Sequence, residues 1–158
     1  MKRIKHALYY IAYTLAYGFW YLMSLLPLRV LYVLSDLLCL LMARVMKYRH
    51  KVIWKNLTES FPEKSEQELK QIERGFYHYF CDYIVETIKL MTMSREQLMQ
   101  RMTFTGLEEL NKVLADGQSV AVYLGHYGNW EWITAMPHWI TGQALCCQLY
   151  HPLENEYF

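Results

Sequence analysis

The sequence has almost no excess of charge of either sign. Lysine and arginine number 16 and aspartate and glutamate 15 in 158 residues, which gives a formal net charge of +1. Proteins that bind nucleic acid usually carry a marked basic excess, so this balance argues against a nucleic-acid partner. The charges are unevenly placed, however, because the first 55 residues contain a single acid, Asp36.

Cysteine is scarce and lacks a recognisable pattern. The four cysteines are Cys39, Cys81, Cys146 and Cys147. Their spacing fits neither a zinc site nor a disulfide framework, and adjacent cysteines such as the last two rarely bridge. We therefore predict four reduced thiols, which suits a cytoplasmic catalytic face, and no structural metal. A G-x-S-x-G sequence is also missing, which disfavours a hydrolase with a nucleophilic serine.

The longest uncharged run lies at the N-terminus. Residues 7–26 contain no charged side chain, follow three basic residues and are rich in tyrosine and tryptophan. About 20 residues of helix cross a hydrocarbon core, and aromatic rings gather at membrane interfaces, so we predict a retained transmembrane anchor. The alternative is a buried, aromatic-rich helix of a soluble domain.

A second apolar segment follows Pro27. Residues 28–46 contain Arg29, Asp36 and Arg44, and a charge at a bilayer centre is costly, so a second span is disfavoured unless Asp36 is paired. We expect a helix that lies along the interface or packs on the catalytic domain. Residues 47–55 are basic and suit either an anionic membrane leaflet or a solvated helix face. The predicted domains are therefore residues 1–46, the membrane anchor and interfacial helix, and residues 47–158, the N-terminal part of an α/β domain.

Capping signals predict the starts of three helices in the part of the chain that follows residue 64. Three residue pairs have the spacing of a capping box: Ser65 with Glu68, Ser94 with Gln97, and Thr105 with Glu108. Apolar positions at helical spacing extend the first helix to about residue 90. The second helix is predicted to be short, and the third to end at Asp116 and Gly117.

The last 40 residues predict an α/β fold. Residues 119–124 and 144–150 are apolar runs typical of buried strands. Between them, Asn129 is placed to cap a helix over residues 130–136 that Pro137 ends. Two strands do not make a stable sheet, and the chain stops soon after the second, so we expect an incomplete sheet in the N-terminal part of an α/β domain.

One segment has the composition of a catalytic loop. Residues 125–131 read GHYGNWE and place His126 after the first predicted strand and Glu131 in the first turn of the following helix. A carboxylate that orients one imidazole nitrogen leaves the other to act as a base. The glycines allow a tight turn, and helix N-terminal N–H groups can hold an oxyanion. The predicted substrate-binding residues are Gly125, Gly128, Asn129 and Trp130. A structural histidine is the alternative, and His138 and His151 are competing candidates.

These features together resemble a known family. An H-x4-(D/E) box after a strand, preceded by an N-terminal anchor, resembles the bacterial lipid A biosynthesis acyltransferases. Two further stretches agree: the segment from Tyr48 through Asn56-Leu57 to Phe61-Pro62, and residues 76–80 with Asp82 and Glu86. The resemblance implies transfer of a fatty acyl chain from acyl carrier protein to a hydroxyl of a lipid A precursor, without a cofactor.

The resemblance also implies roles and a location. By matching position, His126 is the general base and Glu131 its partner, at a bacterial inner membrane with the catalytic domain facing the cytoplasm. Members of the family are longer, so we expect this chain to be an N-terminal part of the enzyme that lacks some of the acceptor and acyl pockets. The alternatives are another glycolipid, phospholipid or aminolipid acceptor, a non-catalytic membrane-associated module, and a histidine-based hydrolase.

Overall fold

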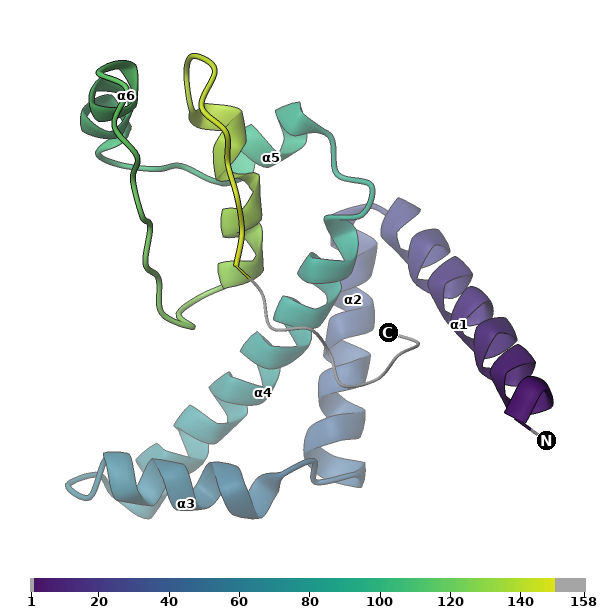
Figure 1. Cartoon of the computed structure of the whole chain (residues 1–158). Coiled ribbons are helices and arrows are strands. Elements are labelled where there is room, and N and C mark those ends of the chain that lie inside the picture. The colour runs from purple at the N-terminus through teal and green to yellow at the C-terminus, as the bar shows by residue number, and fades with distance from the viewer. Residues whose placement is uncertain (1, 150–158) are drawn as a thin grey trace. The chain divides into compact units, whose positions relative to one another are not determined.

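The computed structural model describes residues 2–149, with side chains from residue 6 onward, and consists of helices joined by loops (Figure 1). The described residues form two compact units, one over residues 23–89 and the other over residues 2–22 and 90–149. The elements are α1 (Lys2–Leu25), α2 (Leu28–Leu40), the π-helix η1 (Leu41–Val45), α3 (His50–Ser60), α4 (Glu66–Lys89), α5 (Arg95–Arg101), α6 (Leu107–Ala115) and the 3₁₀ helix η2 (Trp130–Trp139).

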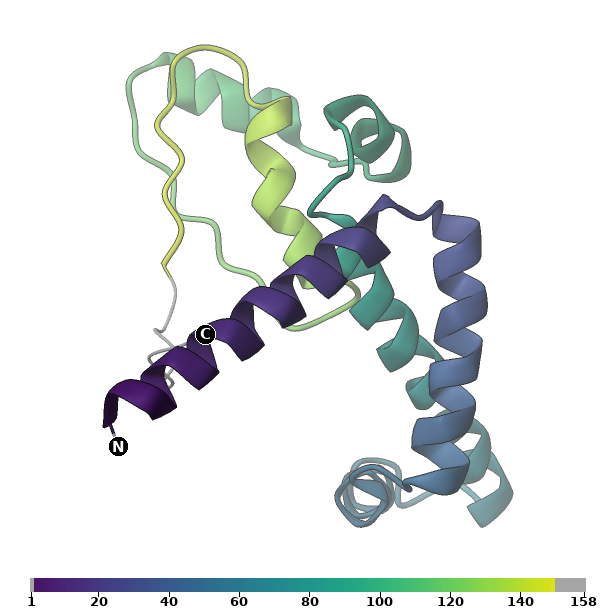
Figure 2. The same ribbon diagram turned by 90° about the vertical axis from the view of Figure 1, so that its right-hand side faces the viewer.

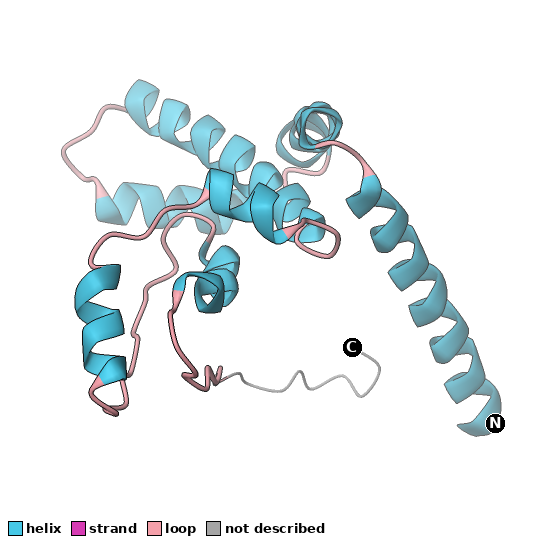
Figure 3. Ribbon diagram, turned by 90° about the horizontal axis from the view of Figure 1, so that it is seen from above, coloured by secondary structure: helices cyan, strands magenta, loops and turns pink. Residues whose placement is uncertain are grey.

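The predicted α/β fold class is wrong. No residue between 2 and 149 belongs to a strand, as the colouring of Figure 3 shows. Residues 119–124 and 144–149 are extended loops whose side chains are largely exposed, with Tyr123 and Leu145 at 94% and 90%. A strand needs a neighbour for its backbone N–H and C=O groups and a layer to cover its apolar face. Tyr150, the last residue of the second predicted strand, lies outside the described residues.

The first apolar run does form a helix, α1, but the predicted transmembrane anchor is wrong. Within residues 2–149, no helix combines the length and the apolarity that a membrane crossing requires. The physical reason is composition, because five tyrosines in this run carry hydroxyl groups that lower its hydropathy. The alternative of a buried helix is wrong as well, since Leu8, Tyr10 and Leu15 are each more than 60% exposed.

Within the unit of residues 23–89, α2 packs along α4 (Figure 1). Cys39 and Met42 from the α2–η1 segment join Tyr77 and Cys81 from α4 in one buried cluster. Residues 28–46 therefore pack on α4. Asp36 is paired, through a 3.6 Å contact with His78 of α4.

Two polar contacts fix the register of α2 on α4. The Ser35 hydroxyl donates to Asp82 Oδ1 at 2.6 Å, and the Tyr32 hydroxyl donates to Glu86 Oε1 at 2.8 Å. Because a hydrogen bond to a charged group is stronger than one between neutral groups, these pairs disfavour a sliding of the helices past each other. They also account for the hydroxyl groups of Tyr32 and Ser35 within a largely apolar α2.

Lys89 makes the polar contacts at the other end of the α2–α4 pair. Its ammonium group is buried and donates to the backbone oxygens of Ser24, at 2.8 Å, and Leu26, at 3.0 Å. Carbonyls at the end of a helix lack partners within the helix, so a cation there satisfies them and complements the helix dipole. Burial lowers the pKa of Lys89 below its ordinary value.

A tight turn joins η1 to α3, which runs across the end of the α2–α4 pair (Figures 1 and 2). Lys47 and Arg49 have positive φ angles of 49° and 50°, which are unfavourable for residues with a Cβ atom. The turn is held in place because the buried Tyr77 hydroxyl donates to the Tyr48 carbonyl at 2.8 Å. The Tyr48 ring also stacks on Phe80 of α4.

The predicted capping signals are confirmed at two of three helices. Glu68 bonds back to Ser65 ahead of α4, and Ser94 with Gln97 forms a complete capping box at α5. At α6 the prediction is wrong, because the N-cap is Gly106 and not Thr105. Gly106 has a φ of 78°, a conformation that favours glycine. The end of α6 is as predicted, at Asp116 and Gly117.

The cysteines fall into two classes, which predicts unequal alkylation. Cys39 and Cys81 are buried, whereas Cys146 and Cys147 are exposed. Burial raises the pKa of the Cys81 thiol to about 11 and also raises that of Cys39. Only the thiolate reacts, so at pH 8 we expect N-ethylmaleimide to label the exposed pair roughly a hundred times faster than the buried pair. Mass spectrometry of the native protein would show two rapid adducts, with four after denaturation. Equal rates for all four would contradict the packing of α2 on α4.

Candidate active site

The segment that carries the predicted box continues into η2, and η2 is anchored by tryptophan. Trp132 and Ala135 are buried together with Leu98 of α5. Leu90, Met93, Met102 and Trp139 surround this cluster. The spacing of Trp132, Ala135 and Trp139 is helical, so one face of η2 packs on α5 and the second half of the box is fixed to it.

Three further contacts hold the end of η2. The Phe104 and Trp139 rings meet edge to face at 5.1 Å, and the Arg95 guanidinium donates to the His138 carbonyl at 3.1 Å. Beyond η2, the Thr141 N–H donates to Asn111 Oδ1 of α6 at 2.8 Å. The helix reaches Trp139, three residues past the predicted end, because Pro137 sits inside a 3₁₀ helix and does not end it.

His126 lies just before this anchored helix, on the exposed loop. Its ring meets the Trp130 ring edge to face, with 4.7 Å between the centroids and an interplanar angle of 90°. Gly128, between them, has a φ of 63°, so the turn that brings the two rings together favours glycine at this position. An exposed imidazole beside an aromatic ring is open to a substrate.

Glu131 occupies the first turn of η2, as predicted, and its side chain is half-buried. Within the described part of the chain no ion pair joins it to His126, whose ring contact is with Trp130. The base and partner roles of these two residues stay predictions.

Two of the helix N-terminal N–H groups proposed to bind an oxyanion have partners in this structure. Trp130 N–H donates to the Gly128 carbonyl at 3.1 Å, and Trp132 N–H donates to the Asn129 carbonyl at 3.2 Å. Asn129 stands at the N-cap of η2 but its side chain makes no capping hydrogen bond, contrary to the sequence expectation. The substrate-binding roles of Gly125, Gly128, Asn129 and Trp130 therefore stay predictions.

The other histidines occupy different settings. His138 is exposed near the end of η2, with its ring tilted against Trp139. His50 and His78 contact carboxylates of Glu73 and Asp36 in the unit of residues 23–89. The remaining competitor, His151, lies outside the described residues.

Trp132 positions the box, although no motif in the sequence marks it. Its burial against Leu98 fixes η2. The signal was present in the helical spacing of the apolar residues after Glu131, which continues through Pro137.

Comparison with known proteins decides the family. The sequence profile described as bacterial lipid A biosynthesis acyltransferase matches residues 1–156. The chain belongs to the bacterial lipid A biosynthesis acyltransferase family. The resemblance recognised from the box and its flanking segments is thereby confirmed, and acyltransferase chemistry in lipid A biosynthesis is the activity that membership implies. No curated protein and no solved structure matches this family member significantly.

Proposed function

We propose that this acyltransferase moves a fatty acyl group from acyl carrier protein to a hydroxyl of a lipid A precursor. The observation that carries the proposal is the family match over residues 1–156, which contains the whole of the box from Gly125 to Glu131. The exposed His126 beside a fixed helix supports it, since a general base must be within reach of its substrate.

The reaction we propose needs no covalent acyl-enzyme. His126 removes the proton of the acceptor hydroxyl, and the oxygen attacks the thioester carbonyl. The tetrahedral oxyanion then collapses, the carbon–sulfur bond breaks, and the protonated His126 returns its proton to the leaving thiolate. Glu131 hydrogen-bonds the second imidazole nitrogen during this cycle and stabilises the imidazolium. Donor and acceptor supply every reacting group, so no cofactor enters.

The cellular site we propose is the cytoplasmic face of the bacterial inner membrane. Acyl carrier protein is a cytoplasmic donor, and the acceptor is a lipid, so the reaction belongs at that boundary. The exposed aromatic side chains of α1 are of the kind found at a membrane surface.

An acyl-transfer assay tests the function. Radiolabelled lauroyl-acyl carrier protein is incubated with the gene product at its natural length and with one acceptor at a time: an under-acylated lipid A precursor, a lysophospholipid or an aminolipid. We expect label in the lipid A precursor, with a mass increase of one acyl chain by mass spectrometry. Label only in a phospholipid or aminolipid would assign a different acceptor. Release of free fatty acid without an acceptor would indicate a hydrolase, and no turnover at all would favour a non-catalytic module.

A further inference from the structure

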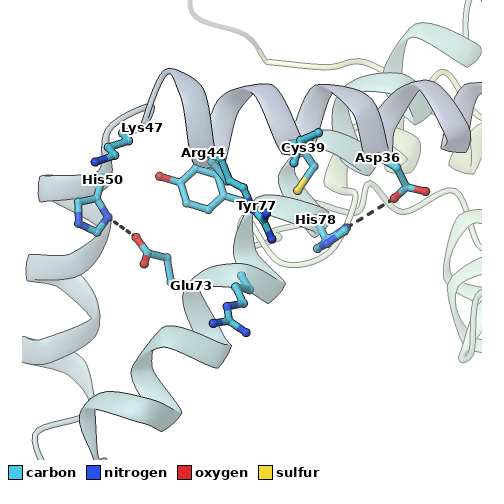
Figure 4. A pocket seen from close by; sticks show the side chains of 11 residues that line it. Asp36, Cys39, Arg44, Lys47, His50, Glu73, Tyr77 and His78 are labelled. Carbon is cyan, nitrogen blue, oxygen red and sulfur yellow. Dashed lines mark hydrogen bonds and ion pairs between the residues drawn. The ribbon is translucent and has the colours of Figure 1, made fainter.

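A second candidate site lies in the unit of residues 23–89, away from the catalytic box in sequence. An open pocket of about 710 Å³ is formed by the end of α2, η1, the following turn and the middle of α4 (Figure 4). Its lining includes three permanent cations, Arg44, Lys47 and Arg74. Arg44 interrupts an apolar segment and Lys47 sits in the turn with positive φ, so the chain brings charge to this place from separate elements.

The carboxylates of the pocket do not neutralise these cations directly. Glu73 contacts His50 at 2.5 Å and Asp36 contacts His78 at 3.6 Å, as the dashed lines in Figure 4 show. Across the described residues, Arg44, Lys47 and Arg74 take part in no ion pair. Cations gathered in one concave site without anionic partners favour an anion as ligand.

The pocket is held in shape by buried contacts. Tyr77 is 3% exposed, and the hydrogen bond from its hydroxyl to the Tyr48 carbonyl fixes the turn that carries Lys47. On the other side, η1 makes a π-type hydrogen bond from Met46 N–H to the Leu41 carbonyl at 2.9 Å. Single π-helical turns within helices are frequent at functional sites. The cations are thus placed by a backbone that is already organised.

An exposed apolar stripe leads to the pocket along α2 and η1. Its members follow helical spacing on the face opposite the buried one, and their exposed fractions are 60% for Val33, 59% for Leu37, 50% for Leu40, 45% for Leu41 and 71% for Val45. Leu40 itself lines the pocket. A stripe of exposed apolar side chains that ends at a cluster of cations is complementary to an anionic phospholipid, whose acyl chains are joined to a negatively charged headgroup.

We infer that this pocket binds the phosphate group of an anionic phospholipid, with the acyl chains along the stripe of α2 and η1. Arginine guanidinium groups hydrogen-bond phosphate in a bidentate manner, and lysine adds a compact charge. Apolar contacts between the acyl chains and α2 then make a lipid bind more tightly than a free phosphate ion. The site lies in a different unit of the chain from His126, and the inference does not depend on the proposed acyl transfer.

Binding of short-chain lipids tests the inference without any turnover. Isothermal titration calorimetry of the intact gene product would use dihexanoyl phosphatidic acid, dihexanoyl phosphatidylcholine and inorganic phosphate as separate probes. We expect the phosphatidic acid to bind at least about tenfold more tightly than either other probe, because only it offers both the charge and the chains.

Variants separate the two parts of the site. The triple variant Arg44→Gln, Lys47→Gln and Arg74→Gln removes three charges from the pocket. A matched control, Lys51→Gln, Lys55→Gln and Lys70→Gln, removes three exposed charges from the same unit outside it. We expect the pocket variant to lose at least about tenfold more affinity for phosphatidic acid than the control. Leu37→Ser with Leu41→Ser should weaken phosphatidic acid binding and leave phosphate binding unchanged.

Several results would overturn the inference. Equal losses in the pocket and control variants would mean general electrostatic attraction, and equal affinity for phosphate and phosphatidic acid would mean a simple anion site. Binding of phosphatidylcholine as tightly as phosphatidic acid would show that the charge of the headgroup does not contribute to affinity. Since all substituted side chains are exposed, far-ultraviolet circular dichroism should show unchanged helix content in every variant.

Discussion

Replacement of His126 by alanine is expected to abolish acyl transfer. General-base catalysis contributes roughly 10²–10⁴-fold to a rate, and a variant that has lost the base keeps only the contribution of substrate binding. The exposed His126 contacts Trp130 and takes no part in the buried cluster of this unit, so its removal should leave the fold intact. The measurement is kcat/KM for transfer from lauroyl-acyl carrier protein to the lipid A precursor.

His138→Ala is the matched control for this experiment. His138 is another exposed histidine beside a tryptophan on the same segment. The comparison therefore separates a specific role of His126 from the general effect of removing an exposed imidazole. Glu131→Gln should give an intermediate rate, because glutamine can still accept a hydrogen bond but does not stabilise an imidazolium. A His126→Ala rate within about twofold of the unaltered protein would reject the assignment of the base. A loss of activity in His138→Ala instead would transfer that assignment to His138.

Truncation of Leu31 is expected to have the largest effect on stability. Leu31 has no exposed surface and lies on the buried face of α2 with Leu28, Ser35 and Cys39. Leu→Ala substitutions at buried sites cost about 2–5 kcal/mol, because apolar contact is lost and a cavity remains. Leu31→Ala should therefore lower the free energy of unfolding by that amount, measured by urea denaturation followed through the helical circular dichroism signal.

Val33→Ala provides the control on the same helix. Val33 is 60% exposed, so its truncation should change the free energy of unfolding by no more than about 0.5 kcal/mol. A comparable loss for both variants would show that the stripe of α2 is covered in solution. An unchanged free energy in Leu31→Ala would contradict the packing of α2 on α4.

Local signals predicted much of the helical part. Ser65 with Glu68 and Ser94 with Gln97 mark helix starts because a side chain near in sequence satisfies N–H groups that the helix leaves without partners. The end of α6 followed from Gly117, which has a φ of 74°. Such contacts involve residues three or four apart, so they need no knowledge of the rest of the fold.

Local signals were not sufficient to predict whether the two apolar runs form strands. An apolar, β-branched run such as residues 119–124 indicates that the segment suits a sheet, but a strand exists only where another segment pairs with it. In the structure this pairing is not made, and the run is exposed. Likewise, the hydropathy of α1 depends on side chains whose amphipathic rings fit several environments, so the uncharged length of the run was an insufficient criterion.

The sequence by itself determined the family, through the His126–Glu131 box and its flanking segments, and it determined helix starts at α4 and α5, because both depend on residues close together in the chain. Only the tertiary structure decided that α2 packs on α4, that Trp132 anchors the helix after the box, and that Arg44, Lys47 and Arg74 meet in one pocket. Those three arrangements join residues far apart in sequence. Their energies come from burial and charge that exist only once the helices have packed.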